Sequence, residues 1–284
     1  MANVIKLKRG TSTPTTSDIV DGEVAIDKSA QKFYVNDGGT VKEIGGGGGL
    51  ESDAQNNTVG GTNAGDSFSG TSATDNTLIG KNTGTAVSDG DKNTALGSNA
   101  LQTISSSYNN VAIGFEASKN QTHIPTSGGA FTFQGSNNTA VGFQALVSNT
   151  VGREITAIGG KALSSLTGDQ LGFNTAVGFS SLASLTVARD NCAVGNFAGF
   201  AVTTGEGNTT IGTSAGKITT GSNNVCLGRK AGNSGSNITG SNNILIGYEA
   251  YPSSLTVSNE ITLGDANITK LRIPALSFSI SASA

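Results

Sequence analysis

The sequence is short of the residues that carry most binding and catalytic chemistry. Its 284 residues include no Trp, one His, two Cys and one Met, and only 13% are charged and 5% aromatic. Two Cys and one His cannot supply the four ligands of a Cys/His zinc site. The net charge of -3 predicts no basic surface for nucleic acid. No run of 18 apolar residues is present, so we expect no membrane insertion.

Small polar residues and glycine take the place of what is missing. The chain has 41 Gly, 27 Asn, 33 Ser and 34 Thr, together 135 of 284 residues. A typical domain is about 45–50% apolar and about 25% charged, so a large core of Leu, Ile and Phe is excluded. Disorder driven by charge is excluded too, because it needs more Lys, Glu and Pro. We therefore expect a regular architecture that buries small residues and relies on backbone hydrogen bonds.

A short sequence unit repeats along most of the chain. The stretch 93–101 (NTALGSNAL) returns at 138–146 as NTAVGFQAL. Alignment on the glycine gives successive spacings of 20, 17, 17, 28, 17, 19, 17, 17, 16, 19 and 17 residues. A fixed short period predicts a solenoid with one repeat per coil. The twelve aligned glycines are Gly60, Gly80, Gly97, Gly114, Gly142, Gly159, Gly178, Gly195, Gly212, Gly228, Gly247 and Gly264.

Each repeat alternates as a β-strand does. An aliphatic residue precedes the glycine and Thr or an apolar residue lies two positions earlier, whereas the residue between them is usually small and is Ala in six repeats. Period two indicates one short strand with two distinct faces. We expect a turn at the glycines, including Gly97, Gly114, Gly142, Gly178, Gly195 and Gly212. Stacked asparagines, including Asn174, Asn191 and Asn208, are predicted to form a side-chain ladder.

The predicted fold is all-β, with a parallel β-solenoid or β-roll of about 12 coils. A coil of about 17 residues is thin, and both faces of its strand lack charge. We expect a homotrimer, intertwined or side by side, that buries the small-residue face. In this interpretation the aliphatic face fills each coil and the Ala face lies at the three-fold axis.

The N-T-A-[VI]-G-x-x-A units resemble the head repeats of trimeric autotransporter adhesins, which form a parallel β-roll trimer. They are also similar to the repeats of bacteriophage tail fibres, notably those of marine short-tailed phages. The resemblance covers residues 53–266. It implies an elongated trimeric shaft.

Residues 1–44 differ from the repeats. Segments 4–8, 22–27, 32–36 and 40–44 are predicted strands, and Asp37-Gly38-Gly39 is a hairpin turn, so we expect a small β-meander. Residues 45–52 contain five glycines and are predicted to be a hinge.

Within this region, segments 5–10 (IKLKRG), 22–26 (GEVAI) and 33–36 (FYVN) resemble the N-terminal module of phage fibre and tropism proteins, which often lies at the virion end. That resemblance makes Lys6, Lys8 and Arg9 candidate virion-docking residues, against the alternative of a solvated strand face.

The C-terminal region, residues 267–284, is predicted to be a strand or tip. Segment 260–265 resembles the last coil of fibres that continue into an intramolecular chaperone domain. We expect that such a domain was either removed after trimerisation or never present.

One spacing of 28 residues marks an insertion of about eleven residues. It contains His123, Phe131 and Phe133. Insertions in solenoids emerge as side loops and often bind ligands. These three residues are candidates for a receptor-contact loop in which a glycan stacks on a ring, against the alternative that both Phe cover the local core.

Catalysis is not predicted. A glycoside hydrolase would need two carboxylates at a set separation, and the acidic residues are scattered; one His gives no readable Ser–His–Asp arrangement. We predict no catalytic residue, no cofactor and no metal. Cys192 and Cys226 are two coils apart and at opposite-facing positions, so both are expected to be free thiols.

These expectations combine into one hypothesis. The chain is a structural virion fibre, or another surface appendage of a phage, that attaches through its N-terminal region and mediates host adsorption. Its expected partners are its own copies, a phage tail or adaptor or nozzle protein, and a host cell-surface glycan or protein. A capsid head fibre or decoration protein and a bacterial trimeric adhesin are the alternatives; the absence of an apolar secretory signal after Arg9 counts against the adhesin.

Overall fold

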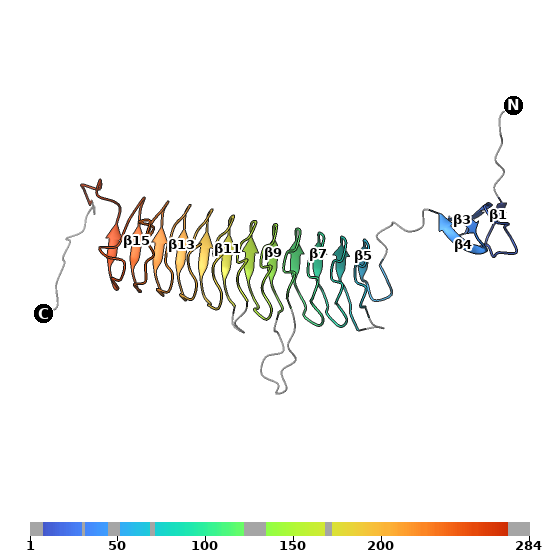
Figure 1. Ribbon diagram of the computed structural model, residues 1–284, viewed down its shortest axis with the longest axis horizontal. Helices are drawn as coiled ribbons and strands as arrows, with labels where there is room; N and C mark the ends of the chain where they lie inside the picture. The colour runs from blue at the N-terminus through green and yellow to red at the C-terminus, as the bar shows by residue number, and fades with distance from the viewer. Residues whose placement is uncertain are drawn as a thin grey trace, which may run out of the picture. The chain divides into compact units, whose positions relative to one another are not determined.

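The computed structural model describes residues 8–29, 32–44, 52–68, 72–121, 135–167 and 172–271. The chain divides into two compact units, Met1–Glu51 and Ser52–Ala284. Throughout the described ranges the regular structure is β, as predicted (Figure 1). Within those ranges there is no helix that could cross a membrane. The predicted hinge at 45–52 lies outside the described residues except for Ser52.

The N-terminal unit is a four-stranded sheet in the order β1 (Lys8–Gly10), β2 (Val24–Asp27), β3 (Lys32–Asp37) and β4 (Thr40–Ile44). Strands β2, β3 and β4 are antiparallel neighbours, which agrees with the predicted meander. Strand β1 instead runs parallel to β2, and residues 4–7 of the predicted first strand lie outside the described residues. A parallel pair cannot be joined by a tight turn, so residues 11–23 form the long connection.

The β3–β4 hairpin has the turn that the sequence predicts. Asp37 pairs with Thr40, and the two residues between them are Gly38 and Gly39. Their φ angles are 59° and 80°, in the left-handed region that the favoured two-residue hairpin turn requires.

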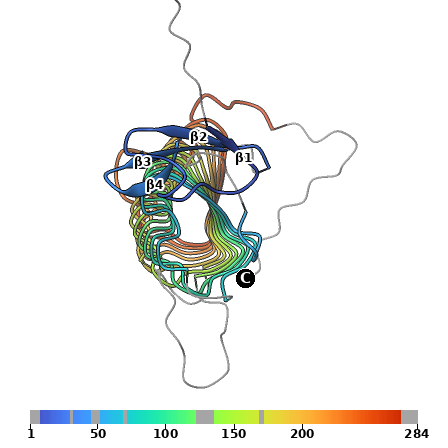
Figure 2. The same ribbon diagram turned by 90° about the vertical axis from the view of Figure 1, so that its right-hand side faces the viewer.

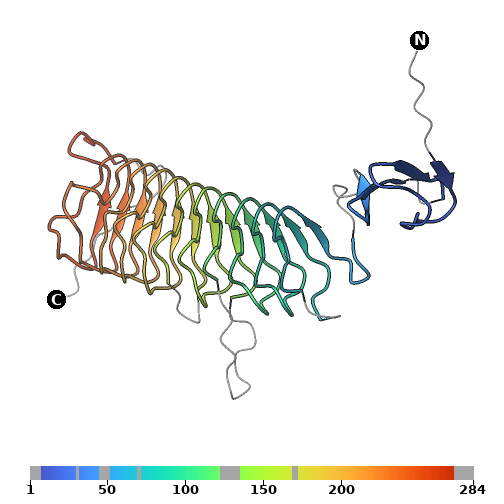
Figure 3. The ribbon, with the colours of Figure 1, turned by 45° about the vertical axis from the view of Figure 1, so that its right-hand side comes forward.

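The second unit is a β-solenoid whose twelve strands form one parallel sheet in the order of the sequence (Figures 1 and 3). Viewed nearly along the stack, successive coils superimpose (Figure 2). The strands have three residues each: β5 (Thr58–Gly60), β6 (Thr77–Ile79), β7 (Thr94–Leu96), β8 (Val111–Ile113), β9 (Thr139–Val141), β10 (Thr156–Ile158), β11 (Thr175–Val177), β12 (Cys192–Val194), β13 (Thr209–Ile211), β14 (Val225–Leu227), β15 (Ile244–Ile246) and β16 (Ile261–Leu263).

The register corrects the alignment of the first repeat. Gly60 pairs with Ile79, and Val59 pairs with Leu78. Gly61, not Gly60, therefore occupies the turn position equivalent to Gly80. Two consecutive glycines made the sequence alignment ambiguous by one residue, and strand pairing resolves it because a shift of one reverses the faces.

The assignment of the two strand faces was wrong. From β6 to β15 the middle residue of every strand is buried. Ala95 and Ala157 are fully buried, whereas the aliphatic residues that follow them, Leu96 and Ile158, are 47% and 39% exposed. The Ala face therefore fills the coil and the aliphatic face points outward.

The reason for this orientation is the narrow interior of each coil. Residues from the opposite wall, such as Leu101 and Leu146, are fully buried and occupy most of the interior. Four of the six coils with Ala in the middle of the strand carry a buried Leu at the fourth position after the turn glycine: Leu101, Leu146, Leu163 and Leu182. In β6 the sizes are reversed, since Leu78 faces Gly84 and a Cβ at Gly84 would lie 2.6 Å from Leu78 Cδ1. Large and small residues thus compensate across the coil, as close packing demands.

The predicted asparagine ladder is present inside the stack. Asn208 donates from its backbone N to Asn191 Oδ1 at 3.0 Å and from Nδ2 to the same oxygen at 3.2 Å. Asn191 makes the same two bonds to Asn174. Nδ2 of Asn191 also donates to the Gly205 carbonyl at 2.9 Å. Each buried amide is satisfied by the coil before it and by its own coil, which stabilises the stack.

The ladder has one interruption and two capped ends. Ile155 occupies the Asn position in the β10 coil, where its backbone N still donates to Asn138 Oδ1 at 3.0 Å. At the first coil Asp53 accepts from Asn57 N and Nδ2 at 2.8 and 3.0 Å. At the last coil Glu260 donates its backbone N to Asn243 Oδ1 at 2.9 Å. Both ends of the ladder therefore finish on a carboxylate residue.

Candidate functional site

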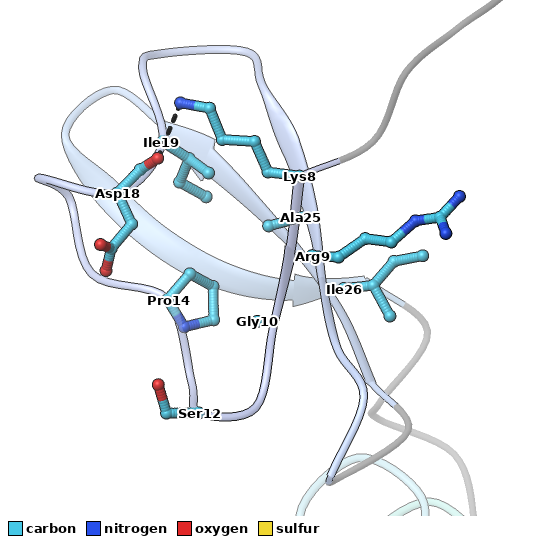
Figure 4. A pocket seen from close by; sticks show the side chains of 9 residues that line it. All are labelled: Lys8, Arg9, Gly10, Ser12, Pro14, Asp18, Ile19, Ala25 and Ile26. Carbon is cyan, nitrogen blue, oxygen red and sulfur yellow. Dashed lines mark hydrogen bonds between the residues drawn. The ribbon is translucent and has the colours of Figure 1, made fainter.

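The N-terminal unit contains a pocket of about 260 Å³ between β1, β2 and the loop that connects them (Figure 4). Ile19, Ala25 and Ile26 supply apolar surface, while Ser12 and Asp18 supply polar groups. The pocket contains two of the predicted docking residues, Lys8 and Arg9, which both belong to β1. Lys6 lies outside the described residues.

Lys8 is engaged within its own unit. Its Nζ donates to the Asp18 carbonyl at 2.8 Å and forms an ion pair with Glu23 Oε2 at 2.8 Å. The Lys8 hydrogen bond is the main reason why the pKa of Glu23 lies below its ordinary value. Hydrogen bonds from Thr15 likewise lower the pKa of Asp18. Lys8 is therefore a structural residue that ties β1 to the connecting loop.

Arg9 has a different environment. Its side chain is exposed and extends away from Lys8 and Asp18 (Figure 4). No hydrogen bond or ion pair joins its guanidinium to another of the described residues. Of the two docking candidates that the structure describes, Arg9 is the one whose charge is available to a partner.

The last coil carries a shallow hollow of about 490 Å³, lined by Glu249, Tyr251, Thr262, Leu263, Gly264, Asp265, Ala266 and Asn267. Lys230 pairs with Glu249 at 3.1 Å, and this contact is the main cause of the lowered pKa of Glu249. The ion pair therefore favours the deprotonated form of Glu249. Across the described ranges, no group of three His, Cys, Asp or Glu side chains is arranged to hold a metal ion.

The predicted receptor-contact residues His123, Phe131 and Phe133 lie outside the described residues. The structural residues of the repeat are described, and they have the predicted roles. Gly142 has φ 136°, and a Cβ there would lie 2.6 Å from the carbonyl carbon of Gly159 in the next coil. Gly97, Gly114, Gly178, Gly195 and Gly212 belong to the same column, with φ between 129° and 137°.

The outward sheet face is the largest surface feature that the sequence interpretation misplaced. We call its two rows of side chains the outward face. One row starts each strand: Thr58, Thr77, Thr94, Val111, Thr139, Thr156, Thr175, Cys192, Thr209, Val225, Ile244 and Ile261. The other ends each strand: Gly60, Ile79, Leu96, Ile113, Val141, Ile158, Val177, Val194, Ile211, Leu227, Ile246 and Leu263. The absence of charge in both rows was the signal available in the sequence.

The two cysteines are free thiols, as their spacing predicts. Cys192 belongs to the outward face and is partly exposed, whereas Cys226 is the buried middle residue of β14. Burial raises the pKa of the Cys226 thiol to about 12. Cys226 is therefore a protonated core residue at neutral pH, and Cys192 is the accessible thiol of the pair.

Comparison with known proteins gives no relative for this chain. No family model matches it, and neither a curated protein nor a solved structure is similar to it. The geometry described above is therefore the basis for a functional proposal.

Proposed function

We propose that this chain is the shaft of a virion fibre, in which three copies associate in parallel along their outward faces. The solenoid supplies a stiff rod, and the N-terminal unit attaches the rod to the phage particle. The exposed surface of the assembled fibre contacts the host cell. Arg9 is the docking contact and Lys8 supports it.

The observation that carries this proposal is the composition of the outward face. It comprises two residues on each of twelve strands, 24 positions, and none of them is charged. Leu96, Ile158 and Ile246 are 47%, 39% and 37% exposed. A solvated surface normally carries many Lys and Glu side chains, and their absence from a large apolar patch is typical of an interface.

The regular repeat indicates what covers this face. Its side chains recur once per coil, at the spacing of about 4.8 Å that separates hydrogen-bonded strands. A partner that packs against all twelve coils must have the same repeat over the same length. A second and a third copy of this chain meet that requirement, and closed three-fold symmetry leaves no copy with an uncovered face.

Attachment and host contact rest on the N-terminal resemblance to phage fibre modules and on the exposed Arg9. The partner at the particle would be a tail, adaptor or nozzle protein, and the partner at the host a cell-surface glycan or protein. Three linked copies would strengthen weak receptor contacts through their high effective concentration.

Two measurements test the proposal. Light scattering of the full chain should give three times 28.3 kDa, about 85 kDa, and a stable monomer would contradict the assembly. Gold-labelled antibody against the chain should decorate phage tails in electron micrographs. Labelling of capsids would instead favour a head fibre, and labelling of bacterial surfaces would favour an adhesin.

A further inference from the structure

The outward face has a weakness as an interface, because its coils are nearly alike. Neighbouring positions at the ends of the strands differ by one methyl group, as between Val141 and Ile158, or are identical, as at Val177 and Val194. Hydrophobic exchanges of this size cost little. If one copy slid along another by one coil, eleven of the twelve coils would still be paired. The outward face therefore does not specify which coil meets which.

A neighbouring row of side chains is irregular. We define the ridge row as the residue that follows the turn glycine in each coil. Over the middle of the stack it runs Ser98, Phe115, Phe143, Gly160, Phe179 and Asn196. Along these six coils the side chain is first a hydroxyl, then an aromatic ring in two coils. It is absent at Gly160, and is then a ring at Phe179 and an amide at Asn196. Because only the turn glycine separates it from the outward face, the ridge row borders that face.

The rings of the ridge row are exposed and held in defined positions. Phe115, Phe143 and Phe179 are 45%, 49% and 50% exposed. Phe115 and Phe143 stack with centroids 5.8 Å apart and an interplanar angle of 11°. Phe179 packs edge to face with Phe197 at 5.5 Å. A Cβ added at Gly160 would lie 3.3 Å from Phe179 Cδ2, so this ring covers the vacant position.

The charged members of the ridge row, Lys81, Arg229 and Asp265, lie outside the stretch that contains Phe115, Phe143 and Phe179. Lys81 follows the β6 strand and Arg229 follows β14, where Arg229 stacks on Tyr248 at 5.3 Å. These charges place the row at the border of the interface rather than at its centre. Aromatic residues are enriched at protein interfaces relative to the rest of the surface, so exposed rings beside the outward face favour contact with a neighbouring copy.

We propose that the ridge row sets the axial register between copies of this chain. This inference rests on the proposed assembly through the outward face. In register, each ring meets the coil of the neighbouring copy that is shaped for the same ring. After a slip of one coil, Phe143 would meet the Gly160 level and Phe179 would meet the Asn196 level, which leaves a void in one place and a crowded or polar contact in the other. Irregular side chains of this kind raise the free energy of the slipped assembly, and so they favour the correct register.

The chain carries its own reporter of register. Cys192 and Thr175 occupy the same outward row, one coil apart. Two chains are refolded together. The first is the parent, whose accessible thiol is Cys192; the second carries Thr175→Cys and Cys192→Ser, so that its accessible thiol lies one coil earlier. Tags of different length distinguish the two chains on a gel. Oxidation with copper phenanthroline then links thiols at the same level, since a disulfide requires close Cα atoms. In the correct register it joins two copies of the same chain type. After a slip of one coil it joins a parent chain to a Thr175→Cys chain.

The test compares three proteins in this assay and by light scattering. The first is the parent, the second carries Phe115→Ser, Phe143→Ser and Phe179→Ser, and the third carries Gly160→Phe, which fills the vacant position. A Phe173→Ser chain is the matched control, because Phe173 is an equally exposed ring, 40%, on another row. Far-ultraviolet circular dichroism establishes that each variant is folded.

We expect the parent and the control to give like-chain products and one mass. The triple variant should raise the slipped-to-correct ratio by about tenfold, the equivalent of about 1.4 kcal/mol, and broaden the mass distribution because staggered copies leave uncovered ends. Gly160→Phe should raise the ratio as well. An unchanged ratio in both variants, or a triple variant that dissociates without slipping, would overturn the register role. A monomeric parent would instead overturn the proposed assembly, so the two failures are distinguishable.

Discussion

At the scale of single residues, two requirements explain the composition of the shaft. The turn glycines adopt φ near 130° and stack directly against the next coil, so any side chain there would be both strained and blocked. Inside the coil, residues on facing walls must share a fixed volume, so a large residue on one wall demands a small one on the other.

The glycine column gives the first prediction. Gly142→Ala should lower the free energy of unfolding by about 3 kcal/mol, because the new Cβ needs an unfavourable φ and would lie 2.6 Å from Gly159. Thermal melting followed by circular dichroism measures the change. Gly160→Ala is the control, since its φ is outside the left-handed region and its nearest neighbour is the Phe179 side chain at 3.3 Å rather than backbone. Equal effects of the two substitutions would refute the explanation.

Volume compensation gives the second prediction. Leu78→Ala should cost about 2–5 kcal/mol of stability by leaving a cavity, and Gly84→Leu alone should cost stability by overpacking. The double variant should recover most of the loss, because Leu146 already adopts the required φ of 56° opposite an Ala. A double-mutant cycle in chemical denaturation measures the coupling. Additive effects would contradict the proposed compensation.

At the scale of structural elements, the asparagine ladder links the coils from within. Asn191, for example, donates to Asn174 in the coil before it and accepts from Asn208 in the coil after it, so its removal would leave buried polar groups unpaired. The interruption at Ile155 shows that one step can be lost when the backbone bond to Asn138 remains. The ladder thus adds to the backbone pairing of the parallel strands.

The ladder gives the third prediction. Asn191→Ala should destabilise the shaft by about 3 kcal/mol, because Asn208 N and Nδ2 and the Gly205 carbonyl lose their partner in a buried site. Asn196→Ala is the matched control, since Asn196 is exposed on the adjacent turn. Denaturant unfolding should separate the two clearly. A loss below about 1 kcal/mol at Asn191 would mean that water replaces the amide.

The carboxylate ends of the ladder give the fourth prediction. Hydrogen bonds from Asn57 lower the pKa of Asp53 below 3.8, and those from Ser253 lower the pKa of Glu260 below 4.5. A carboxyl whose pKa is lower in the folded state stabilises the fold above its unfolded pKa. The stabilisation by Asp53 and Glu260 is therefore lost as the pH falls below their ordinary pKa values and then through their lower pKa values in the folded state.

The measurement for this prediction is the melting temperature between pH 6 and pH 2. The Asp53→Asn, Glu260→Gln chain should be less stable than the parent at pH 6 and should lose less stability on acidification. Equal pH profiles would show that the two carboxylates do not secure the ends.

At the scale of the whole molecule, the uncharged outward face is the feature that connects the fold with its proposed role. If the solenoid were monomeric, we would expect charged side chains on the outward face as well. Charged residues occur instead in the segments between the strands, for example Lys161, Glu206 and Lys230. The separation of charged turns from an uncharged sheet supports association along the full length.

The outward face gives the fifth prediction. If the proposed trimer of about 85 kDa, three times 28.3 kDa, forms, Ile158→Glu combined with Val177→Glu should convert it to monomer, because two charges per copy would be buried without partners. Thr204→Glu, an exposed residue on a bend away from the strands, should leave the mass unchanged. Light scattering of the three chains is the measurement. Unchanged association of the double variant would show that the outward face is not the interface.

The amino-acid sequence by itself determined the period, the solenoid strands and turn glycines of eleven of the twelve repeats, the asparagine ladder and the free cysteines. These features follow from local rules, since a glycine column or a residue alternation has the same meaning in every repeat. The sequence also predicted the hairpin at Gly38 and Gly39, but not the parallel pairing of β1, because that pairing depends on where a long connection returns.

Only the tertiary structure decided which face of the strand is inside. Alternation defines two faces without saying which one is enclosed, and the answer depends on the volume left by residues such as Leu101 and Leu146 across the coil. The same holds for the N-terminal pocket, where Lys8 and Arg9 are adjacent in sequence and equal in charge. Their roles separate because only Lys8 lies within reach of Glu23 and the Asp18 carbonyl.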